Sequence, residues 1–388
     1  MAKHIPFITS KETKQIAEGT FGDSDYVRLA AHQSPDLRLP GAKIWIDPAV
    51  DGLDEWAKKS SNPNAWTRYI KGLDHYDKIA DSDFWQKPTT GKDDVQAFVN
   101  SVLTKCLAFD PHWITVPQLP LVEGSPRHRI NRLLAAATGN WRTTARFSGR
   151  LILPLILTNQ RLVKKKAARN QKVKQANACF VNARADGIWV IETDLKDDSG
   201  AGNMSDRIKW LIDFHEELNA AIPAGIRVAG PYWATNLLLW SRGLINFPAI
   251  GIGGGYQYMT PGGMVTNAII KVAIAPLRRT TRLGGLQSWL DKAISRITPA
   301  HPACGEFTVL RNTLSNLSSR EPAKRQVARF YKTWFDALAG TPAQGRALAL
   351  FQDVSSAYAL GKTLPQLDRK DSARKPHAVA EPLMMNCL

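Results

Sequence analysis

The stretch IRVAGPYWATNLLLWSRGLINFPAIGIGGGYQYMTP, residues 226–261, decides the expected fold. Its two short apolar runs, at 226–229 and 249–252, flank an apolar segment of helical length at 235–244, and each run leads into glycine. This pattern predicts a strand, helix, strand unit. Strands that alternate with helices form parallel sheets, in which functional residues lie where the strands end. Gly230 and the glycines at 253–255 are therefore expected where a ligand approaches the main chain.

The rest of the chain continues this alternation. Further strand candidates, separated by helical segments, lie at residues 43–47, 113–116, 151–157, 184–194, 269–275 and 307–310. Seven or eight strands in a chain of 388 residues predict an α/β fold, a (β/α)8 barrel with a C-terminal helical appendage. An open doubly wound parallel sheet is the alternative, because periodicity does not separate the two architectures.

The expected domain organisation has three parts. Residues 1–310 form the barrel domain, with an elaborated connection around residues 60–105. Residues 311–368 form a C-terminal helical segment, because the pattern turns helical after Ser319. Residues 369–388 are expected to be a flexible basic tail.

Composition indicates the kind of partner and the compartment. Lys and Arg number 51 against 34 Asp and Glu, a formal net charge of +17. A positive field attracts polyanions, so nucleic acid, DNA or RNA, is the expected partner, with partner proteins as a further expectation. The four cysteines form no CxxC pair, which argues against a zinc site or a disulfide framework and favours a cytoplasmic setting. No apolar run approaches the roughly 20 residues of a membrane span, and neither a metal nor a cofactor is expected.

Three acidic residues at strand ends are the candidate catalytic groups. Asp47 ends the strand candidate KIWID, although an acid at this junction also suits the capping of a following helix. Glu192 and Asp194 are two residues apart on a strand, so their side chains are expected to point to the same side, into the barrel or toward its mouth. Paired carboxylates serve proton transfer, metal binding or attack on a sugar carbon. The alternative is a pair balanced by arginines of the barrel.

Glycines and polar side chains that follow strands are the expected ligand contacts. The sequence GIGGG at 251–255 comes late in the chain and is prolonged by a loop instead of opening a helix, which distinguishes it from the dinucleotide-binding fingerprint. It leaves a main chain that can approach a flat or anionic group, with tyrosines beside it that can stack on that group. The expected ligand-binding residues are Gln118, Asn159, Gln160, Tyr232, Gly253, Gly254, Gly255, Tyr256 and Gln257.

Two basic clusters follow strand candidates. The cluster within residues 161–174 is too dense for one face of a helix, so part of it is solvated, and a soluble outer helix is the alternative to phosphate contact. The arginines after 269–275 suit phosphate because guanidinium matches phosphate geometry. The expected phosphate- or nucleic-acid-binding residues are Lys164, Lys165, Lys166, Arg169, Arg278 and Arg279.

The segment PAIGIGGGY at residues 248–256 resembles the glycine-rich strand end with which tRNA-guanine transglycosylases and related DNA-modifying transglycosylases hold the target base. Asp47 and the pair Asn159-Gln160 follow in the same order as a general acid and an amide reader of that family. The resemblance covers residues 43–260. It implies a (β/α)8 barrel, a nucleic-acid partner and base exchange at a glycosidic bond through an aspartate nucleophile, here Asp194 or Glu192. The DSGGFQ strand end and the CxCxxC zinc motif of the family are absent.

Three functions remain open from the sequence. The first is an enzyme that acts on nucleic acid or a nucleotide, at an N-glycosidic or a phosphodiester bond. The second is a non-catalytic subunit that binds nucleic acid or protein on a degenerate barrel. The third is a barrel enzyme for a phosphorylated metabolite, whose positive charge steers the substrate.

Overall fold

The structure is a computed structural model, and it describes residues 4–50, 53, 65–79, 91–125, 127–159, 161–193, 195, 204–252, 270–367 and 375–388. Some residues singled out in the sequence lie outside these ranges, and their expected roles stay predictions: Gln160, Asp194, Gly253, Gly254, Gly255, Tyr256 and Gln257.

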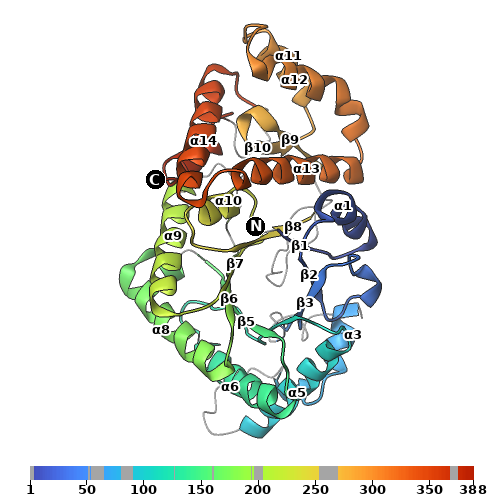
Figure 1. Cartoon of the computed structure of the whole chain (residues 1–388), viewed down its shortest axis with the longest axis vertical. Coiled ribbons are helices and arrows are strands. Elements are labelled where there is room, and N and C mark those ends of the chain that lie inside the picture. Colours follow the sequence, from blue (N-terminus) through green and yellow to red (C-terminus); the bar gives the residue numbers. More distant parts are fainter. Residues whose placement is uncertain are drawn as a thin grey trace.

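Eight parallel strands form a closed barrel, in which β1 pairs with β8 to complete the ring (Figure 1). The expected (β/α)8 barrel is confirmed, and the pairing of Ile5 with Ala249 across β1 and β8 excludes an open sheet. The strand, helix, strand unit predicted at 226–252 is present as β7, α10 and β8. The barrel strands are β1 (Ile5–Phe7), β2 (Tyr26–Ala30), β3 (Lys43–Asp47), β4 (Trp113–Thr115), β5 (Arg150–Leu157), β6 (Gly187–Glu192), β7 (Ile226–Ala229) and β8 (Phe247–Gly251).

Helices cover the outside of the barrel (Figure 1). Between β2 and β3 the chain forms only a 3-10 turn, η1 (Pro35–Leu37). The described residues of the long connection between β3 and β4 include helical segments. The helices that follow strands of the barrel are α1 (Lys11–Phe21), α3 (Ala65–Lys71), α4 (Tyr76–Ile79), α5 (Lys92–Leu107), α6 (Arg127–Thr144), α7 (Arg161–Lys164), α8 (Lys166–Ala183), α9 (Met204–Ala221) and α10 (Ala234–Ser241).

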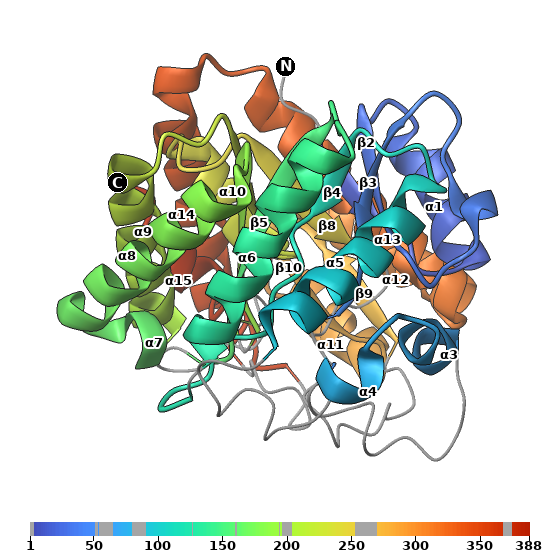
Figure 2. The same cartoon turned by 90° about the horizontal axis from the view of Figure 1, so that it is seen from below.

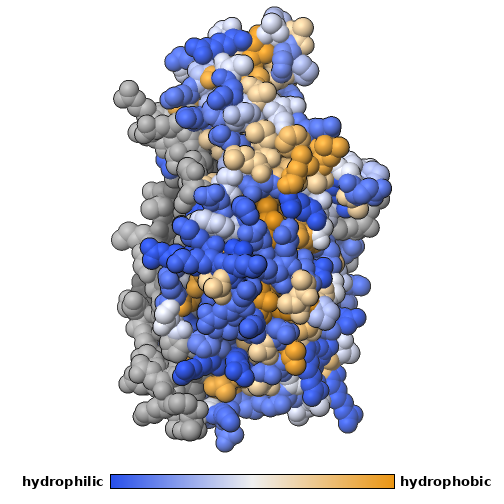
Figure 3. All heavy atoms as spheres, turned by 90° about the vertical axis from the view of Figure 1, so that its left-hand side faces the viewer, coloured by the Kyte–Doolittle hydropathy of each residue, from blue (hydrophilic) through white to orange (hydrophobic). Residues whose placement is uncertain are grey.

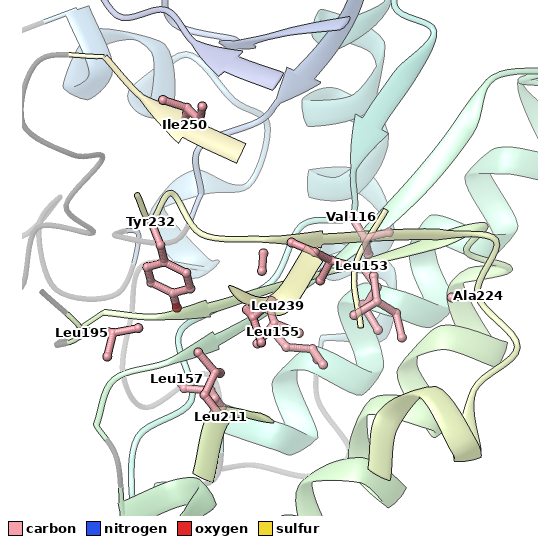
Figure 4. Close-up of a cluster of buried hydrophobic side chains, with 14 of the residues drawn as sticks. Val116, Leu153, Leu155, Leu157, Leu195, Leu211, Ala224, Tyr232, Leu239 and Ile250 are labelled. Carbon is pink, nitrogen blue, oxygen red and sulfur yellow. The ribbon is translucent and has the colours of Figure 1, made fainter. Parts of the chain in front are cut away.

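Strand β5 shows how the sequence builds two cores. Leu153, Leu155 and Leu157 point outward and pack among helix side chains that include Leu211 of α9 and Leu239 of α10 (Figure 4). The alternate residues of the strand point into the barrel, where Ile152 and Ile156 join a separate core. A strand buried on both faces has apolar side chains at every position, which explains its unbroken apolar run.

Helices α6 and α8 approach each other closely at Gly139. A Cβ atom at this position would lie 2.1 Å from the main-chain oxygen of Asn182. Only glycine therefore allows the two helix backbones to pack at this separation. The contact fixes the outer surfaces of α6 and α8 relative to each other.

The C-terminal part differs from the expected division at residue 310. The strand predicted at 269–275 is β9 (Lys271–Ile274), which lies outside the barrel and pairs antiparallel with β10 (Arg279–Arg282). The strand predicted at 307–310 is wrong, because these residues continue helix α12 (Pro302–Thr313), whose N-terminus is capped by His301. β9, α11 (Leu286–Ile294) and α12 contribute to a second, smaller core.

Two long helices link this smaller core to the barrel. Helix α13 (Arg320–Ala339) contacts α1 and α10, and its Phe330 and Phe335 belong to the main core, so it is part of the barrel's helical layer. Helix α14 (Arg346–Thr363) carries Leu350 and Val354 into the same core. The appendage is therefore centred on residues 270–317, and the segment expected at 311–368 mostly covers the barrel.

The described end of the chain is packed, in contrast to the flexible tail expected at 369–388. Helix α15 (Ala380–Met384) lies against α9 and α14, and Leu383 and Cys387 are buried in the main core. Arg242 donates a hydrogen bond from Nη1 to the main-chain oxygen of Asn386 at 3.0 Å. Apolar residues spaced for one helical turn anchor this segment.

Candidate active site

Aromatic side chains fill the centre of the barrel. Trp45, Trp113 and Trp189 point inward from β3, β4 and β6 and are buried. The rings of Trp45 and Trp189 meet edge to face, with centroids 5.0 Å apart, and Phe7 of β1 contacts both. Barrels of this class are packed through the middle and carry their active sites at the carboxyl ends of the strands. Functional side chains are therefore expected at the carboxyl ends of the strands.

Arg28 and Asp47 bring opposite charges into this end of the barrel. Residues 26, 28 and 30 of β2 share the inward face, as do 45 and 47 of β3. Arg28 donates from Nη2 to Oδ2 of Asp47, and its guanidinium lies 4.6 Å from the ring centroid of Phe7. The side chains of Arg28 and Asp47 are 0% and 5% exposed. A buried carboxylate is thus held beside a cation on the neighbouring strand.

Asp47 also serves the turn that follows its strand. Its Oδ1 accepts a hydrogen bond from the main-chain N–H of Ala49 at 2.8 Å. Asp47 therefore has a structural role at this turn, similar to the capping role expected from the sequence. Ala49 adopts a left-handed conformation with φ of 54°, and the side chain of Asp47 helps to hold it there.

His32 and Tyr69 lie within the electrostatic influence of the Arg28–Asp47 pair. Burial, and next the positive charge of Arg28, lower the pKa of His32 to about 4, against the opposing effect of Asp47. Burial raises the pKa of Tyr69, and the charges of Cys106 and Asp47 add to this. The imidazole is therefore neutral and the phenol protonated near neutral pH.

Two buried polar atoms of these residues have no hydrogen-bond partner in the described part of the chain. Among the residues that the structure describes, neither His32 Nδ1 nor the hydroxyl of Tyr69 has a hydrogen-bond partner. Their ring centroids are 6.5 Å apart. Buried polar atoms nearly always have partners, so these two atoms are the candidates in the cluster for contact with a bound molecule. We refer to Arg28, His32, Asp47 and Tyr69 as the carboxyl-end cluster.

Glu192 does not point into the barrel as expected. In β6 the inward residues are Trp189 and Ile191, so Glu192 faces the helical layer. There Arg207 of α9 donates from Nη2 to both carboxylate oxygens, at 3.0 and 2.9 Å. The alternative of a carboxylate balanced by an arginine is therefore correct for Glu192, which does not share a pocket with Asp47.

The described polar candidates that follow strands have structural partners. Gln118 is buried and donates to the main-chain oxygen of Asn131 at 3.0 Å. Tyr232 is buried, and its hydroxyl hydrogen-bonds the main chain of Glu192, which joins the ends of β6 and β7. Asn159 accepts from the N–H of Arg161 at 2.9 Å and so caps the turn into α7. These contacts correct the expectation that Gln118 and Tyr232 bind a ligand.

The basic candidates divide into two groups. Lys164, Lys165 and Lys166 are exposed, as phosphate contact requires. Arg169, by contrast, is buried between Asp213 and Glu217 of α9, at 3.3 and 3.0 Å, and holds α8 on α9. The expected phosphate-binding role of Arg169 is therefore wrong.

The two arginines of the late hairpin are also engaged inside the protein. Arg278 forms a fork with Asp353 of α14, at 2.8 and 2.7 Å. Arg279 is 1% exposed and donates to the main-chain oxygen of Lys375 at 2.9 Å. The β9–β10 hairpin lies outside the barrel, so these residues do not form the phosphate site expected after a late barrel strand.

Sequence reasoning missed Arg28, His32 and Tyr69. A usable signal was present for Arg28, because it is the only charged residue in YVRLA and shares its face with Tyr26 and Ala30. For Tyr69 no such signal exists, since it comes from a helix in the long connection and reaches the cluster only through tertiary packing.

Comparison of the chain with protein-family models finds no match, and comparison with curated proteins finds none either. The structure itself defines the class as a (β/α)8-barrel protein. Within the described ranges, no group of three or more His, Cys, Asp or Glu side chains could hold a metal ion. None of the helices in that part of the chain has the length and apolar character needed to cross a membrane.

Proposed function

We propose that the protein is an enzyme that acts on nucleic acid or a nucleotide at the carboxyl-end cluster, by base exchange or cleavage at an N-glycosidic bond. The observation that carries this proposal is the buried Arg28–Asp47 pair beside the unpartnered atoms of His32 and Tyr69, at the end of the barrel where such folds place their chemistry. The net charge of +17 supports a polyanionic substrate.

The chemistry of the cluster suits this reaction. As an N-glycosidic bond breaks, positive charge develops on the sugar and negative charge on the departing base. The carboxylate of Asp47 stabilises the sugar charge or relays a proton, and the protonated phenol of Tyr69 donates a hydrogen bond to the base. Neutral His32 supplies one donor and one acceptor for recognition of the base edge.

The second candidate is a non-catalytic nucleic-acid-binding subunit. One observation favours it: each carboxylate oxygen of Asp47 already accepts a hydrogen bond from the protein, from Arg28 and from Ala49. A carboxylate with this environment also serves as a purely structural counter-ion. For either candidate, the four free cysteines, three of them buried, support a reducing, cytoplasmic location.

Turnover separates the two candidates. The purified protein is incubated with total tRNA and with genomic DNA, and released bases and altered nucleosides are quantified by mass spectrometry. We expect Asp47→Asn and Tyr69→Phe to lower the rate by about 100-fold, as for loss of a proton-transfer group. Asp353→Asn, which breaks an arginine–aspartate pair outside the barrel, should keep the wild-type rate.

Each outcome decides the assignment. Tyr69→Phe removes one hydroxyl and keeps the ring, so it remains informative if Asp47→Asn does not fold. Binding of either polymer without any turnover would support the non-catalytic subunit. Wild-type turnover in folded Asp47→Asn would show that Asp47 is not a catalytic group.

A further inference from the structure

One long part of the sequence contains positive charge without any negative charge. Residues 124–185 hold fourteen Lys and Arg residues and no Asp or Glu, although the chain has 34 acidic residues. This part forms α6, β5, α7 and α8. Acidic side chains are normally favoured in the first turn of a helix by the helix dipole, yet α6, α7 and α8 have none there. The positive charge in the first turns of these helices therefore does not serve helix stability.

The fold gathers these charges beside the mouth of the barrel. Helices in a (β/α)8 barrel run opposite to the strands, so the N-terminal halves of α6 and α8 lie near the carboxyl ends of the strands (Figure 2). Six exposed cations lie in those halves or in the segment that leads directly into α8. They are Arg129 and Arg132 of α6, Lys164 at the end of α7, Lys165 in the link that follows, and Lys166 and Lys174 of α8.

These cations lack neutralising partners. None of the six forms an ion pair with a described residue, whereas Arg142 and Arg150, at the other end of the same region, share Asp186. Within the described residues, half-buried Lys172 donates a hydrogen bond to Gln175, at 3.1 Å, and forms no ion pair. Exposed cations that form no ion pair repel one another, and an anionic partner relieves that repulsion.

Lys172 of α8 lies close to the charged side chains of α6. After burial, the positive charge of Lys172 in α8 is the largest effect that lowers the pKa of His128 in α6, and Arg129 and Arg132 add to it. No carboxylate contributes to this shift. The close packing of α6 on α8 at Gly139 keeps this group of side chains together.

The character of the surface favours nucleic acid over a lipid membrane. Between the cations, α8 presents Asn170, Gln171 and Gln175, amide side chains that bind phosphate and sugar oxygens. A membrane-binding helix would add large apolar side chains to its cations. On α6 and α8 the exposed large apolar residue is Val181, near the far end of α8, and the flank of the molecule around α8 and α9 is mostly hydrophilic (Figure 3).

We propose that Arg129, Arg132, Lys165, Lys166, Lys172 and Lys174 form a surface, the α6–α8 cationic surface, that binds the sugar-phosphate backbone of a nucleic acid. The role of this binding rests on the proposed function, in which the bound strand presents a base to the carboxyl-end cluster. From Lys165 to Lys174 the helix rises about 13 Å, which along the axis of a duplex corresponds to about four phosphates of one strand, at an axial rise of ~3.4 Å each.

The test is the salt dependence of binding. Affinity for fluorescein-labelled tRNA and for a random duplex of about 30 base pairs is measured by anisotropy over a range of salt concentrations. Arg129→Gln/Arg132→Gln/Lys172→Gln is compared with the matched triple Lys292→Gln/Arg296→Gln/Arg329→Gln. The control removes the same charge from exposed residues of α11, α13 and the turn after α11 that have no ion pair among the described residues. A second triple, Lys165→Gln/Lys166→Gln/Lys174→Gln, changes only exposed side chains and guards against misfolding.

We expect both surface triples to weaken binding about tenfold or more and to lower the duplex salt slope by about 2 to 3, since each lost phosphate contact removes ~0.9. The control should change affinity less than twofold. Equal losses in control and surface triples would overturn the inference, as would unchanged binding in both surface triples. Loss of binding to phosphatidylserine vesicles with unchanged nucleic-acid binding would also overturn it, in favour of a membrane.

The result does not depend on the catalytic proposal. Loss of binding in the surface triples alongside absent turnover would support the surface and refute the enzyme. Turnover that depends on Asp47 but not on the α6–α8 cationic surface would support the enzyme and refute the surface.

Discussion

Asp47→Asn should destabilise the fold strongly, whatever its effect on turnover. The substitution keeps the size of the side chain and removes the negative charge beside Arg28, whose side chain is 0% exposed. Breaking a buried ion pair by removing one partner costs about 3–5 kcal/mol, because the remaining charge is left in a medium that solvates it poorly. With an unfolding entropy of roughly 2.1 cal/mol/K per residue over 388 residues, this corresponds to about 4–6 °C in Tm.

Urea unfolding followed by tryptophan fluorescence measures this loss, because Trp189 lies 5.5 Å from the guanidinium of Arg28 and reports on the barrel interior. Asp353→Asn is the matched control. Its pair with Arg278 has side chains that are 28% exposed, so the expected loss is about 1 kcal/mol or less. The double variant Arg28→Met/Asp47→Leu removes both charges, and its free energy of unfolding should lie within about 2 kcal/mol of the wild-type value.

The double variant is also the critical comparison. If Arg28→Met/Asp47→Leu is as unstable as Asp47→Asn, the loss comes from packing or from the turn at Ala49 and not from an uncompensated charge. If Asp47→Asn costs no more than Asp353→Asn, the reasoning about the buried pair is refuted.

Three further variants test other parts of the structure. Burial and the charge of Arg227 lower the pKa of fully buried His215 to about 3. The unfolded chain therefore takes up the proton first, and the free energy of unfolding falls as the pH drops from about 6.5 toward 3. Between about pH 7.5 and pH 5, His215→Phe should lose ~2 kcal/mol less of its unfolding free energy than the wild type, and an unchanged pH profile by urea titration would contradict this. Arg169→Gln should lower the unfolding free energy by about 2–4 kcal/mol and leave nucleic-acid affinity within twofold, the opposite of the effect of a phosphate-binding residue. Gly139→Ala should lower the unfolding free energy by about 1–3 kcal/mol in the same assay, because the added Cβ meets the main chain of Asn182. This loss outweighs the higher helix propensity of alanine. A stabilised variant would show that α6 and α8 can separate.

The barrel was predictable because its strands are apolar runs between helices, and β5, β7 and β8 are present where the sequence indicated. The misassigned segments show the limit of that signal. Residues 271–274 have the composition of a barrel strand, and only their pairing with β10 sets them apart. Residues 307–310 are β-branched and aromatic in part, yet a capped helix continues through them.

The candidate site was less predictable than the fold. In β6 the run IWVIE is apolar at every position before the acid, so the sequence does not reveal which residues face inward, and Glu192 was placed on the wrong side. Asp47 was found because it ends a strand, but its partner Arg28 lies on the neighbouring strand and His32 in the loop that follows that strand. Such a constellation depends on strand register, which a single sequence does not specify.

The tryptophans packed across the middle of the barrel leave no route along its axis. Whatever reaches Asp47 and Tyr69 must withdraw by the path it took inward, so a polymer cannot be threaded through the protein. A nucleotide within a chain could be presented here only by swinging out of its stack while its backbone stays outside, followed by a return along the same path. Such a geometry would favour distributive action, with release after each modified nucleotide, over processive action along a strand.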